Sequence, residues 1–506
     1  MSIAAYLILA RLQPMTTRLS KTRLLNHLQC PKRLYLEIHH RELAEISEDT
    51  KLAFQAGHTV GAIARSFYPD GILIEHDQEL AKALQATQDV LKSQPDRPVF
   101  EATFNHDDVL VRADILKPAE SGHHLIEVKS SASLKDYHLA DCAVQTWVIE
   151  NSGLRLGKVS LSHIDTSFVY PGENRYEGLL HDEDVTERAR KLVTQVPTWV
   201  ESARKTLSGD EPLIEPGEQC SSPYLCPFIA HCCPPPATEY PISLLPYGKK
   251  IISALRQEGY EDLREVPPER LTNPKHQRIH RITLNGVHEL DPAAADIMAI
   301  HPFPRYYFDF ETIQFTVPIW AGTRPYEMLP YQWSCHIEAA NGELRHEEFL
   351  GLGDGAPMRP LAEKLIVVLN SAGPGPVFAY NKGFESGRLA DLDERYPDLS
   401  DELASIRSRL VDPLPIARAH YYHPSMKGSW SLKAVLPAIA PHLDYAGLEH
   451  VQDGGMAGVV YLEILDPQTT LERRDVLISA LRAYCARDTL GLVHLARFLS
   501  RRLDGK

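Results

Sequence analysis

The sequence predicts an α/β protein with more than one hydrophobic core. Its 506 residues exceed what one core usually organises, since chains longer than about 250–300 residues divide into domains. Short β-prone runs at residues 109–116, 125–128 and from Tyr306 onward are preceded and followed by segments with helical apolar spacing. The 43% apolar and 24% charged composition is typical of a globular protein. A formal net charge of −14 argues against a protein that coats nucleic acid, but not against an enzyme with a locally basic channel.

We expect four regions along the chain. Residues 1–15 form an N-terminal extension, because the apolar run 3–10 makes a poor signal peptide and Met15 is the start that we favour. A first domain spans residues 16–237, a small helical bridge 238–300, and a second α/β domain 301–506. No apolar run approaches the roughly 20 residues of a membrane-spanning helix. We therefore expect a cytoplasmic protein without a membrane partner.

The first domain opens with two predicted helices in residues 19–37. Ser20 is placed to cap the first helix, whose leucines recur on one face. Pro31 suits the first position of the second helix, which leaves Cys30 at the junction. A lone cysteine at a helix end is usually a small buried apolar residue, so a functional role for Cys30 depends on partners elsewhere.

A third helix is predicted by apolar spacing over residues 54–68, and it places His58 on the inward face. A single helical histidine is more often an ordinary core or surface residue than a ligand. Glu101, on a predicted strand that follows, can likewise be structural or functional.

The next element is a predicted β-hairpin that carries a hydrolytic pattern. A Pro/Gly turn separates the two β-prone runs, and Asp114 lies on the first of them. Glu127 and Lys129 are two residues apart on the second run and so share a face. Carboxylate oxygens suit Mg²⁺ or Mn²⁺, and a lysine beside such a cation can hold the water that attacks a phosphodiester. The same residues also occur on ordinary solvent-exposed strand faces.

Cysteines cluster at the end of the first domain, in the stretch C-S-S-P-Y-L-C-P-F-I-A-H-C-C-P-P-P that begins at residue 220. Clustered thiolates in a chain without a secretory signal are typical ligands of zinc or an iron–sulfur cluster. The stretch alone offers enough donors for a closed zinc site, namely Cys220, Cys226, His231, Cys232 and Cys233.

The order Cys-Pro-x-Arg, Asp, Glu-x-Lys and clustered cysteines resembles the iron–sulfur RecB-like branch of the PD-(D/E)XK nucleases, over about the first 235 residues. The resemblance implies a restriction-endonuclease-like core in which Lys129 is catalytic. It implies that the catalytic cation is held by His58, Asp114 and Glu127. It also implies a 4Fe-4S cluster that staples the two ends of the domain together, with zinc as the alternative guest; its ligands would be Cys30, Cys220, Cys226 and Cys232.

Two positions depart from the family pattern. The separation of Cys220 and Cys226 exceeds the usual C-x-x-C, which leaves open whether Cys232 or the spare Cys233 is the last ligand. The family follows its lysine with Q-x-x-x-Y. Gln145 matches and is a predicted catalytic residue, but Ile149 stands at the tyrosine position.

The bridge is predicted to hold two short helices joined at Gly259. Helical hairpins of this kind can grip a nucleic-acid backbone through lysines such as Lys249 and Lys250. A packing linker that leaves these lysines on a solvated face is the more common alternative.

The second domain begins with the β-prone run R-Y-Y-F-D-F-E-T-I, which carries Asp309 and Glu311 on one strand face. Two like charges among aromatic residues are costly unless a cation pairs with them. A later helix carries Glu385, and a C-terminal amphipathic helix puts Tyr484 and Asp488 one turn apart.

These pieces resemble the DEDD superfamily of RNase H-like 3′→5′ exonucleases, in which D-x-E on the first strand, an acid on a later helix and Y-x-x-x-D on the last helix build a two-metal centre. The resemblance implies an RNase H-like fold in which Tyr484 orients the attacking water. The implied metal ligands are Asp309, Glu311, Glu385 and Asp488. Glu385 stands where the family usually has aspartate, and Asp412 is interpreted as structural. The stretch G-S-W-S-L-K at residues 428–433, which contains Trp430, is a candidate for stacking on an unpaired base, with a buried core tryptophan as the alternative.

The combination resembles a bacterial family in which a RecB-like iron–sulfur domain is fused to an RNase H-like exonuclease domain. It implies a metal-dependent DNA nuclease of repair, recombination or defence that acts on single-stranded ends beside a helicase or repair partner. The chain lacks a Gly-rich phosphate loop with Lys-Ser/Thr, so we do not expect it to be a helicase itself. Two alternatives stay open: an RNA-trimming 3′→5′ exonuclease, and a nucleic-acid-binding scaffold with an inactive RecB-like site.

Overall fold

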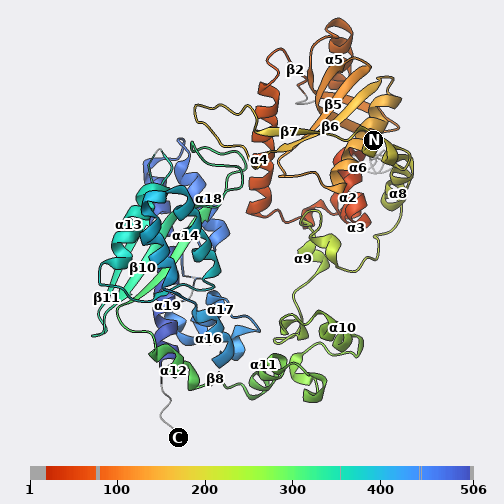
Figure 1. Ribbon diagram of the computed structural model, residues 1–506. Coiled ribbons are helices and arrows are strands. Elements are labelled where there is room, and N and C mark those ends of the chain that lie inside the picture. The colour runs from red at the N-terminus through yellow and green to blue at the C-terminus, as the bar shows by residue number, and fades with distance from the viewer. Residues whose placement is uncertain (1–18, 76–79, 354, 444, 446, 502–506) are drawn as a thin grey trace, which may run out of the picture. The chain divides into compact units, whose positions relative to one another are not determined.

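The computed structural model describes residues 19–75, 80–353, 355–443, 445 and 447–501. The chain divides into two compact units, Met1–Pro234 with Phe315–Tyr326, and Pro235–Gln314 with Glu327–Lys506 (Figure 1). Each unit combines helices with a mixed sheet, so the predicted α/β class is confirmed. The predicted extension and the alternative start at Met15 lie outside the described residues.

The first unit is built on a seven-stranded sheet in the order β2-β3-β4-β5-β6-β7, with β1 also pairing with β4. The predicted hairpin is present, because β4 and β5 are antiparallel neighbours, while β5 and β6 run parallel. The strands are β1 Leu19–Ser20, β2 Ile72–Leu73, β3 Val99–His106, β4 Val109–Ala119, β5 Gly122–Lys129, β6 Leu156–Ile164 and β7 Leu180–Asp184.

The first two helices of the first unit begin as the sequence predicts, whereas the third, predicted from residue 54, begins at Glu48. Ser20 Oγ accepts a hydrogen bond from Arg23 N at 3.2 Å, and Pro31 opens the next helix directly after Cys30. The helices are α2 Lys21–Gln29, α3 Pro31–His39, α4 Glu48–Ser66, α5 Leu80–Ser93, α6 Asp136–Asn151, α7 Thr186–Val193, α8 Val196–Ser208 and α9 Ile229–Cys232.

Helices cover both faces of this sheet. On one face, α6 packs over β3, β4 and β6 in a core that includes Leu125. On the other face, Ala64 of α4 packs against Ile115 and Ile126. Because side chains alternate along a strand, Glu127 lies on the same face as Leu125. The hairpin therefore presents Glu127 to α6.

The second unit contains a five-stranded sheet in the order β11-β10-β9-β12-β13, with β9 at its centre. β9, β10 and β11 are antiparallel, whereas β12 and β13 run parallel to β9. These strands are β9 Arg305–Ile313, β10 Leu329–Glu338, β11 Leu344–Leu350, β12 Val377–Phe378 and β13 Leu410–Val411. A separate antiparallel pair joins β8 Glu289–Leu290 and β14 Tyr421–Tyr422.

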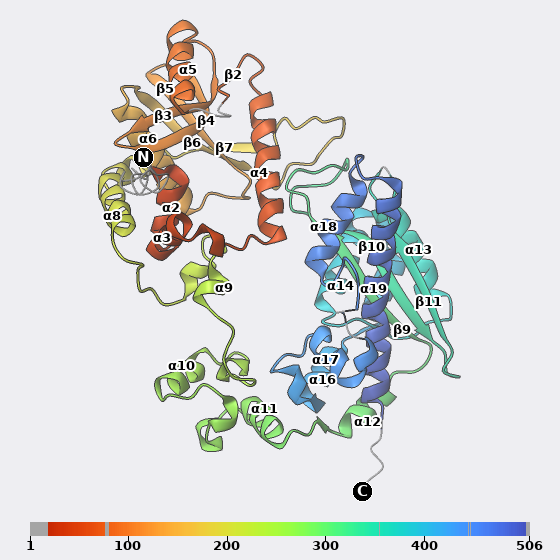
Figure 2. The ribbon, with the colours of Figure 1, turned by 180° about the vertical axis from the view of Figure 1, so that it is seen from behind.

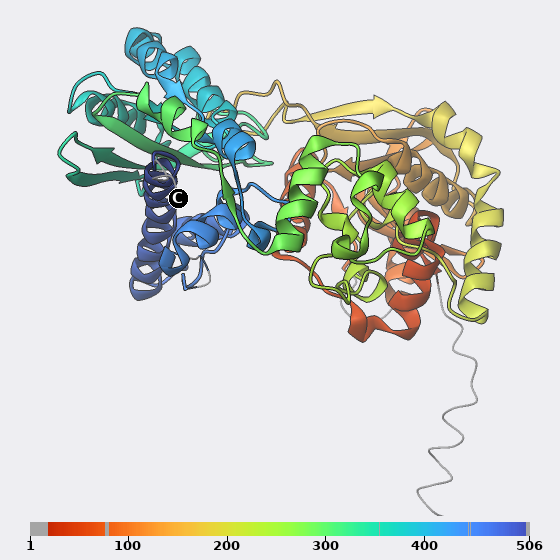
Figure 3. The same cartoon turned by 90° about the horizontal axis from the view of Figure 1, so that it is seen from below.

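Helices α13 and α19 cover opposite faces of this sheet (Figure 3). Gln332 Nε2 donates to Leu481 O of α19 at 3.0 Å, and the next side chain, Trp333, donates to Leu361 O of α13 at 3.2 Å. α18 and α19 lie side by side (Figure 1, Figure 2). The helices are α10 Lys249–Gln257, α11 Pro274–Asn285, α12 Ala293–Ala299, α13 Met358–Asn370, α14 Gly383–Arg395, α15 Ser400–Ser408, α16 Pro413–His420, α17 Leu432–Ile439, α18 Gly454–Leu465 and α19 Leu471–Leu499.

Residues 238–300, which the sequence suggested as a bridge, share the core of the second unit. Leu255, Ile279 and Met298 belong to the same buried cluster as Tyr422 and Leu492. The apolar faces of these helices are therefore buried within the unit rather than left on a separate linker.

Only the first of the two helices expected around Gly259 is an α-helix. α10 ends before Gly259, whose φ of 89° turns the chain, and a short 3₁₀ turn at Leu263–Glu265 follows. Lys249 and Lys250 are exposed on α10, as the solvated-face alternative predicts.

One boundary was not foreseen. The segment Phe315–Tyr326, which follows β9 in the sequence, belongs to the first unit. Val317 packs against Val60, and Tyr170 exchanges backbone hydrogen bonds of 2.8–2.9 Å with residues 322 and 323. Within the described residues, none of the helices combines the length and the apolar character needed to cross a bilayer.

Candidate functional sites

The hairpin of the first unit brings four predicted residues together. Lys129 Nζ donates to Glu127 Oε1 at 2.6 Å, and Gln145 Nε2 of α6 donates to Glu127 Oε2 at 2.6 Å. Asp114 on β4 accepts a hydrogen bond from Val128 N of β5 at 2.7 Å. The acids, the lysine and the amide thus converge because β4, β5 and α6 pack on one another.

Two further residues of this cluster were missed at the sequence level. Lys129 Nζ also lies 2.6 Å from Asp141 Oδ2, while Lys21 Nζ lies 2.7 Å from Glu127 Oε1 and 3.1 Å from Asp141 Oδ1. Asp141 precedes Gln145 by four residues on α6, and this spacing could have identified it. Lys21, in the first turn of α2, carries no comparable signal.

Burial sets the electrostatics of this cluster, hereafter the hairpin cluster, of three carboxylates and two ammonium groups. Burial raises the pKa of Glu127 to about 7, and Asp114 and Asp141 act in the same direction. Burial also raises the pKa of Asp114. Burial opposes ionisation of Asp141 as well, but Lys129 and Lys21 lower the pKa of this acid far below its usual value. One negative charge remains uncompensated when all five groups are ionised.

Of the other candidates in this part of the first unit, the side chains of His58 and Ile149 make no hydrogen bond or ion pair with the cluster within the described residues, whereas the charge of Glu101 helps to raise the pKa of Asp114. His58 is exposed on α4, so the prediction that it faces inward is wrong. Val60 and Ala64 form the buried face of that helix, and a residue two positions before Val60 points the opposite way. The ligand role of His58 stays a prediction. Glu101 has a positive φ of 54°, and its Oε1 lies 3.8 Å from a guanidinium nitrogen of Arg65. Ile149 is fully buried in the core.

The four cysteines predicted as cluster ligands line a single pocket beside Lys32 and Arg33, at the junction of α2 and α3; they are Cys30, Cys220, Cys226 and Cys232. Cys233 is exposed and is not part of the lining. Within the described part of the chain, no three of these sulfurs lie within 4.8 Å of one another. The donor set, four thiols with two cations beside them, fits an iron–sulfur cluster.

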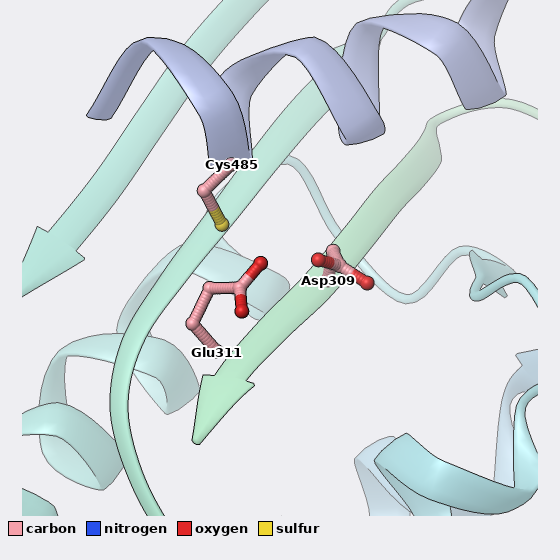
Figure 4. Close-up of side chains that lie close together, drawn as sticks. All are labelled: Asp309, Glu311 and Cys485. Carbon is pink, nitrogen blue, oxygen red and sulfur yellow. The ribbon is translucent and has the colours of Figure 1, made fainter. Parts of the chain in front are cut away.

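The second unit places its predicted acids around the central strand. Asp309 and Glu311 point from β9 toward α19, and the sulfur of Cys485 on α19 lies close to them (Figure 4). One ligand atom from each of these three residues lies within 4.8 Å of the others. Asp309 and Glu311 have no hydrogen-bond or ion-pair partner among the described residues.

Asp488, by contrast, is engaged by two phenols. The hydroxyl of Tyr445 donates to Asp488 Oδ1, and Tyr484 also hydrogen-bonds this carboxylate. Lys433 Nζ lies 5.6 Å from the ring centre of Tyr445 and 5.5 Å from that of Tyr484. The predicted water-orienting tyrosine and its acid therefore lie beside a cation.

Glu385, on α14, is buried, and its Oε2 has no partner within the described ranges. Burial raises the pKa of Glu385 to about 8, with Asp412 acting in the same direction. Asp412 itself caps α16 by accepting from Leu414 N at 2.9 Å, and accepts from Asn381 N at 3.0 Å. Its structural interpretation agrees with these contacts.

The acids of the second unit oppose one another's ionisation. Burial raises the pKa of Asp309 well above its usual value, and the charges of Asp488, Glu311 and Glu385 add to this effect. Burial also raises the pKa of Glu311 well above its usual value, and the charge of Asp488 adds to this effect. Burial raises the pKa of Asp488 to about 6 despite its two phenol donors. A bound cation would remove this repulsion.

Glu385→Gln should make the metal-free protein less sensitive to alkaline pH. The folded pKa near 8 exceeds the ordinary 4.5, so the stability linked to this proton is full below pH 4.5 and is lost as the pH rises through 8. We compare the free energy of unfolding of the variant with that of the native chain. We expect this difference to shift in favour of the variant by on the order of 1–3 kcal/mol between pH 5 and pH 8.5. Thermal unfolding in a chelator at both pH values measures this difference. Glu394→Gln, an exposed change on the same helix, should follow the native curve, and parallel curves for Glu385→Gln would contradict the assignment.

Three residues of this site were not predicted. Cys485 lies three positions before Asp488 on α19, and that spacing could have marked it. Tyr445 and Lys433 come from a loop and from α17, and only tertiary packing brings them in. Trp430 is buried, and its Nε1 donates to Tyr421 O at 2.9 Å, which supports its reading as a core residue rather than a stacking platform.

Comparison with known proteins identifies one region of similarity. Residues 306–431 match a family described as a domain of unknown function, DUF2779. No curated protein matches the chain. The matched stretch contains the acids of β9 and Glu385, whereas Asp488 lies beyond it.

Proposed function

We propose that the chain is a metal-dependent DNA nuclease with a 3′→5′ exonuclease centre in its second unit and a RecB-like hydrolytic centre in its first. The observation that carries the proposal is the pair Asp309 and Glu311. Both carboxylates are largely buried, lie close together and lack any partner among the described residues. Such a pair is costly in an empty site and becomes favourable around a divalent cation.

The placement of the other residues supports an RNase H-like exonuclease. Asp-x-Glu lies on the first and central strand of its sheet, Glu385 on a later helix, and Tyr484 with Asp488 on the last helix. This is the order that the resemblance to DEDD exonucleases implies. In the first unit, the antiparallel hairpin with Asp114, Glu127 and Lys129 supports a PD-(D/E)XK-like core.

In the exonuclease centre, Asp309, Glu311, Glu385 and Asp488 would hold Mg²⁺ or Mn²⁺. A bound cation of this kind lowers the pKa of water and stabilises the departing 3′-oxygen. Tyr484, which hydrogen-bonds Asp488, would orient the attacking water through its hydroxyl. The ammonium of Lys433 would attract the phosphate of the nucleic acid.

In the RecB-like centre, Asp114 and Glu127 would hold the cation. Gln145 fixes one oxygen of Glu127, so the other oxygen keeps its orientation. Lys129 would release its contact with Glu127 to hold water or phosphate, while Asp141 keeps the ammonium in place at 2.6 Å.

The cysteine pocket would hold a 4Fe-4S cluster through Cys30, Cys220, Cys226 and Cys232. Cys30 lies between α2 and α3, and the other three cysteines lie near the end of the segment Met1–Pro234. A shared cluster would therefore tie together the two ends of this segment, which is a structural role.

Cys226→Ser should lower the bound iron and sulfide of anaerobically purified protein to less than half of the native content. Cys226 is a buried lining residue, and a hydroxyl is a poor substitute for a thiolate in such a cluster. Cys233→Ser, at the adjacent but exposed thiol, should retain the native content. Equal iron in all three proteins, or none in the native chain, would exclude the cluster.

A second candidate function applies to the first unit, namely a nucleic-acid-binding scaffold without hydrolytic activity. Lys21 and Lys129 already neutralise Glu127 and Asp141, so this site does not require a cation as the second unit's acids do. The core position of Ile149, where the family has tyrosine, points the same way.

The experiment that tests the proposal is cleavage of 5′-labelled single strands of matched DNA and RNA sequence, with Mg²⁺, with Mn²⁺ and with a chelator. We expect stepwise shortening of DNA from the 3′ end only when a cation is present. Preferred shortening of RNA would support the RNA-trimming alternative. Binding without shortening of either strand would overturn the nuclease proposal.

A further inference from the structure

The donor that α19 presents to the paired acids is a thiol. Cys485 Sγ lies within 4.8 Å of a carboxylate oxygen of both Asp309 and Glu311, and Figure 4 shows the sulfur directed toward the Glu311 carboxylate. The predicted ligand on the same helix, Asp488, is instead engaged by the hydroxyls of Tyr445 and Tyr484.

A thiol donor changes the class of cation that such a site accepts. Mg²⁺ takes oxygen ligands almost exclusively, whereas zinc accepts a mixture of sulfur and carboxylate oxygen and is satisfied by three protein ligands plus water. Zinc also binds a given set of donors more tightly than Mn²⁺ does.

We propose that Asp309, Glu311 and Cys485 form a three-donor site for a borderline divalent cation of the zinc class, and that its occupation excludes the activating cation and stops the exonuclease. The inhibitory part rests on the proposed function, whereas the binding part does not. The two carboxylates cannot serve Mg²⁺ and the zinc-class cation at once, so the two cations compete.

Binding is coupled to loss of the thiol proton. The sulfur–hydrogen bond of Cys485 breaks, a sulfur–metal bond forms, and the proton passes to solvent. Cys485 is fully buried beside the carboxylates of Asp309 and Glu311.

Cadmium is the probe for the binding part, because its bonds to thiolate absorb in the ultraviolet. The full chain, purified anaerobically, is titrated with Cd²⁺ as native protein, Cys485→Ser, Cys485→Ala and Cys335→Ser. Cys335 is a buried thiol of β10 whose recorded contact is a backbone carbonyl. We expect the native chain and Cys335→Ser to show one more cadmium–thiolate equivalent than either Cys485 variant. Equal absorption in all four proteins would overturn the site.

Inhibition is tested on the same proteins at fixed Mg²⁺. We expect Zn²⁺ to inhibit native protein and Cys335→Ser alike, and Cys485→Ser to require at least about tenfold more Zn²⁺ relative to its own uninhibited rate. Equal inhibition of Cys485→Ser, or activation by Zn²⁺, would overturn the inhibitory role. A chain with no nuclease activity at all would refute the proposed function, while the cadmium titration would still decide whether the three-donor site exists.

Discussion

Asp309→Asn is expected to reduce 3′→5′ shortening of single-stranded DNA by at least about 10³-fold. The change removes one of the two carboxylates that we propose as cation ligands and that have no partner among the described residues. The transition-state stabilisation of a metal-assisted displacement is lost with it. The rate of loss of full-length labelled strand at saturating Mg²⁺ measures the effect.

Loss of folding cannot account for this result. Asp309 has a pKa well above the usual value because of burial and three neighbouring acids, so a neutral amide should raise the melting temperature of the metal-free protein. Asp401→Asn, at an exposed acid of α15, is the matched control and should cleave like the native chain. Native-like cleavage by Asp309→Asn would contradict the assignment of the centre.

Lys129→Ala is expected to abolish any cleavage that remains in the Asp309→Asn background. Lys129 Nζ lies 2.6 Å from a carboxylate oxygen of Glu127 and 2.6 Å from one of Asp141, and we propose that it holds the water or the phosphate. A loss on the order of 10²–10³-fold is expected for removal of such a group. Internal cleavage of an end-blocked or circular DNA measures the first unit separately from trimming.

Lys129→Ala also leaves two buried carboxylates with one fewer partner, which costs on the order of a few kcal/mol. Lys129→Arg keeps the charge and serves as the folding control, and Lys158→Ala removes a more exposed lysine on the neighbouring strand β6. If Asp309→Asn alone removes all cleavage, the first unit is the inactive scaffold of the second candidate function.

Local signals account for the parts that the sequence predicted. The cap at Ser20, the hairpin around Asp114 and Glu127, and the strand carrying Asp309 depend on turn chemistry and alternation within a few residues. The spacing of Tyr484 and Asp488 follows from helix geometry alone.

The parts that sequence did not predict depend on tertiary packing. Lys21 reaches Glu127 across 106 residues, and Tyr445 reaches Asp488 across 43, so no local pattern could pair them. The prediction that His58 faces inward is wrong because the apolar spacing was assigned to the wrong face of α4. The region 238–300 was taken for a bridge because its apolar residues find their partners only in distant segments.

The central claim is that Asp309 and Glu311 together bind a divalent cation. Calorimetric titration of Mn²⁺ into the full chain, prepared without free divalent metal, tests it most directly when the native protein is compared with Asp309→Asn. The account predicts that the variant binds fewer Mn²⁺ ions than the native chain, and that Asp401→Asn binds the native number. The same number and affinity of Mn²⁺ ions in Asp309→Asn as in the native chain would contradict it.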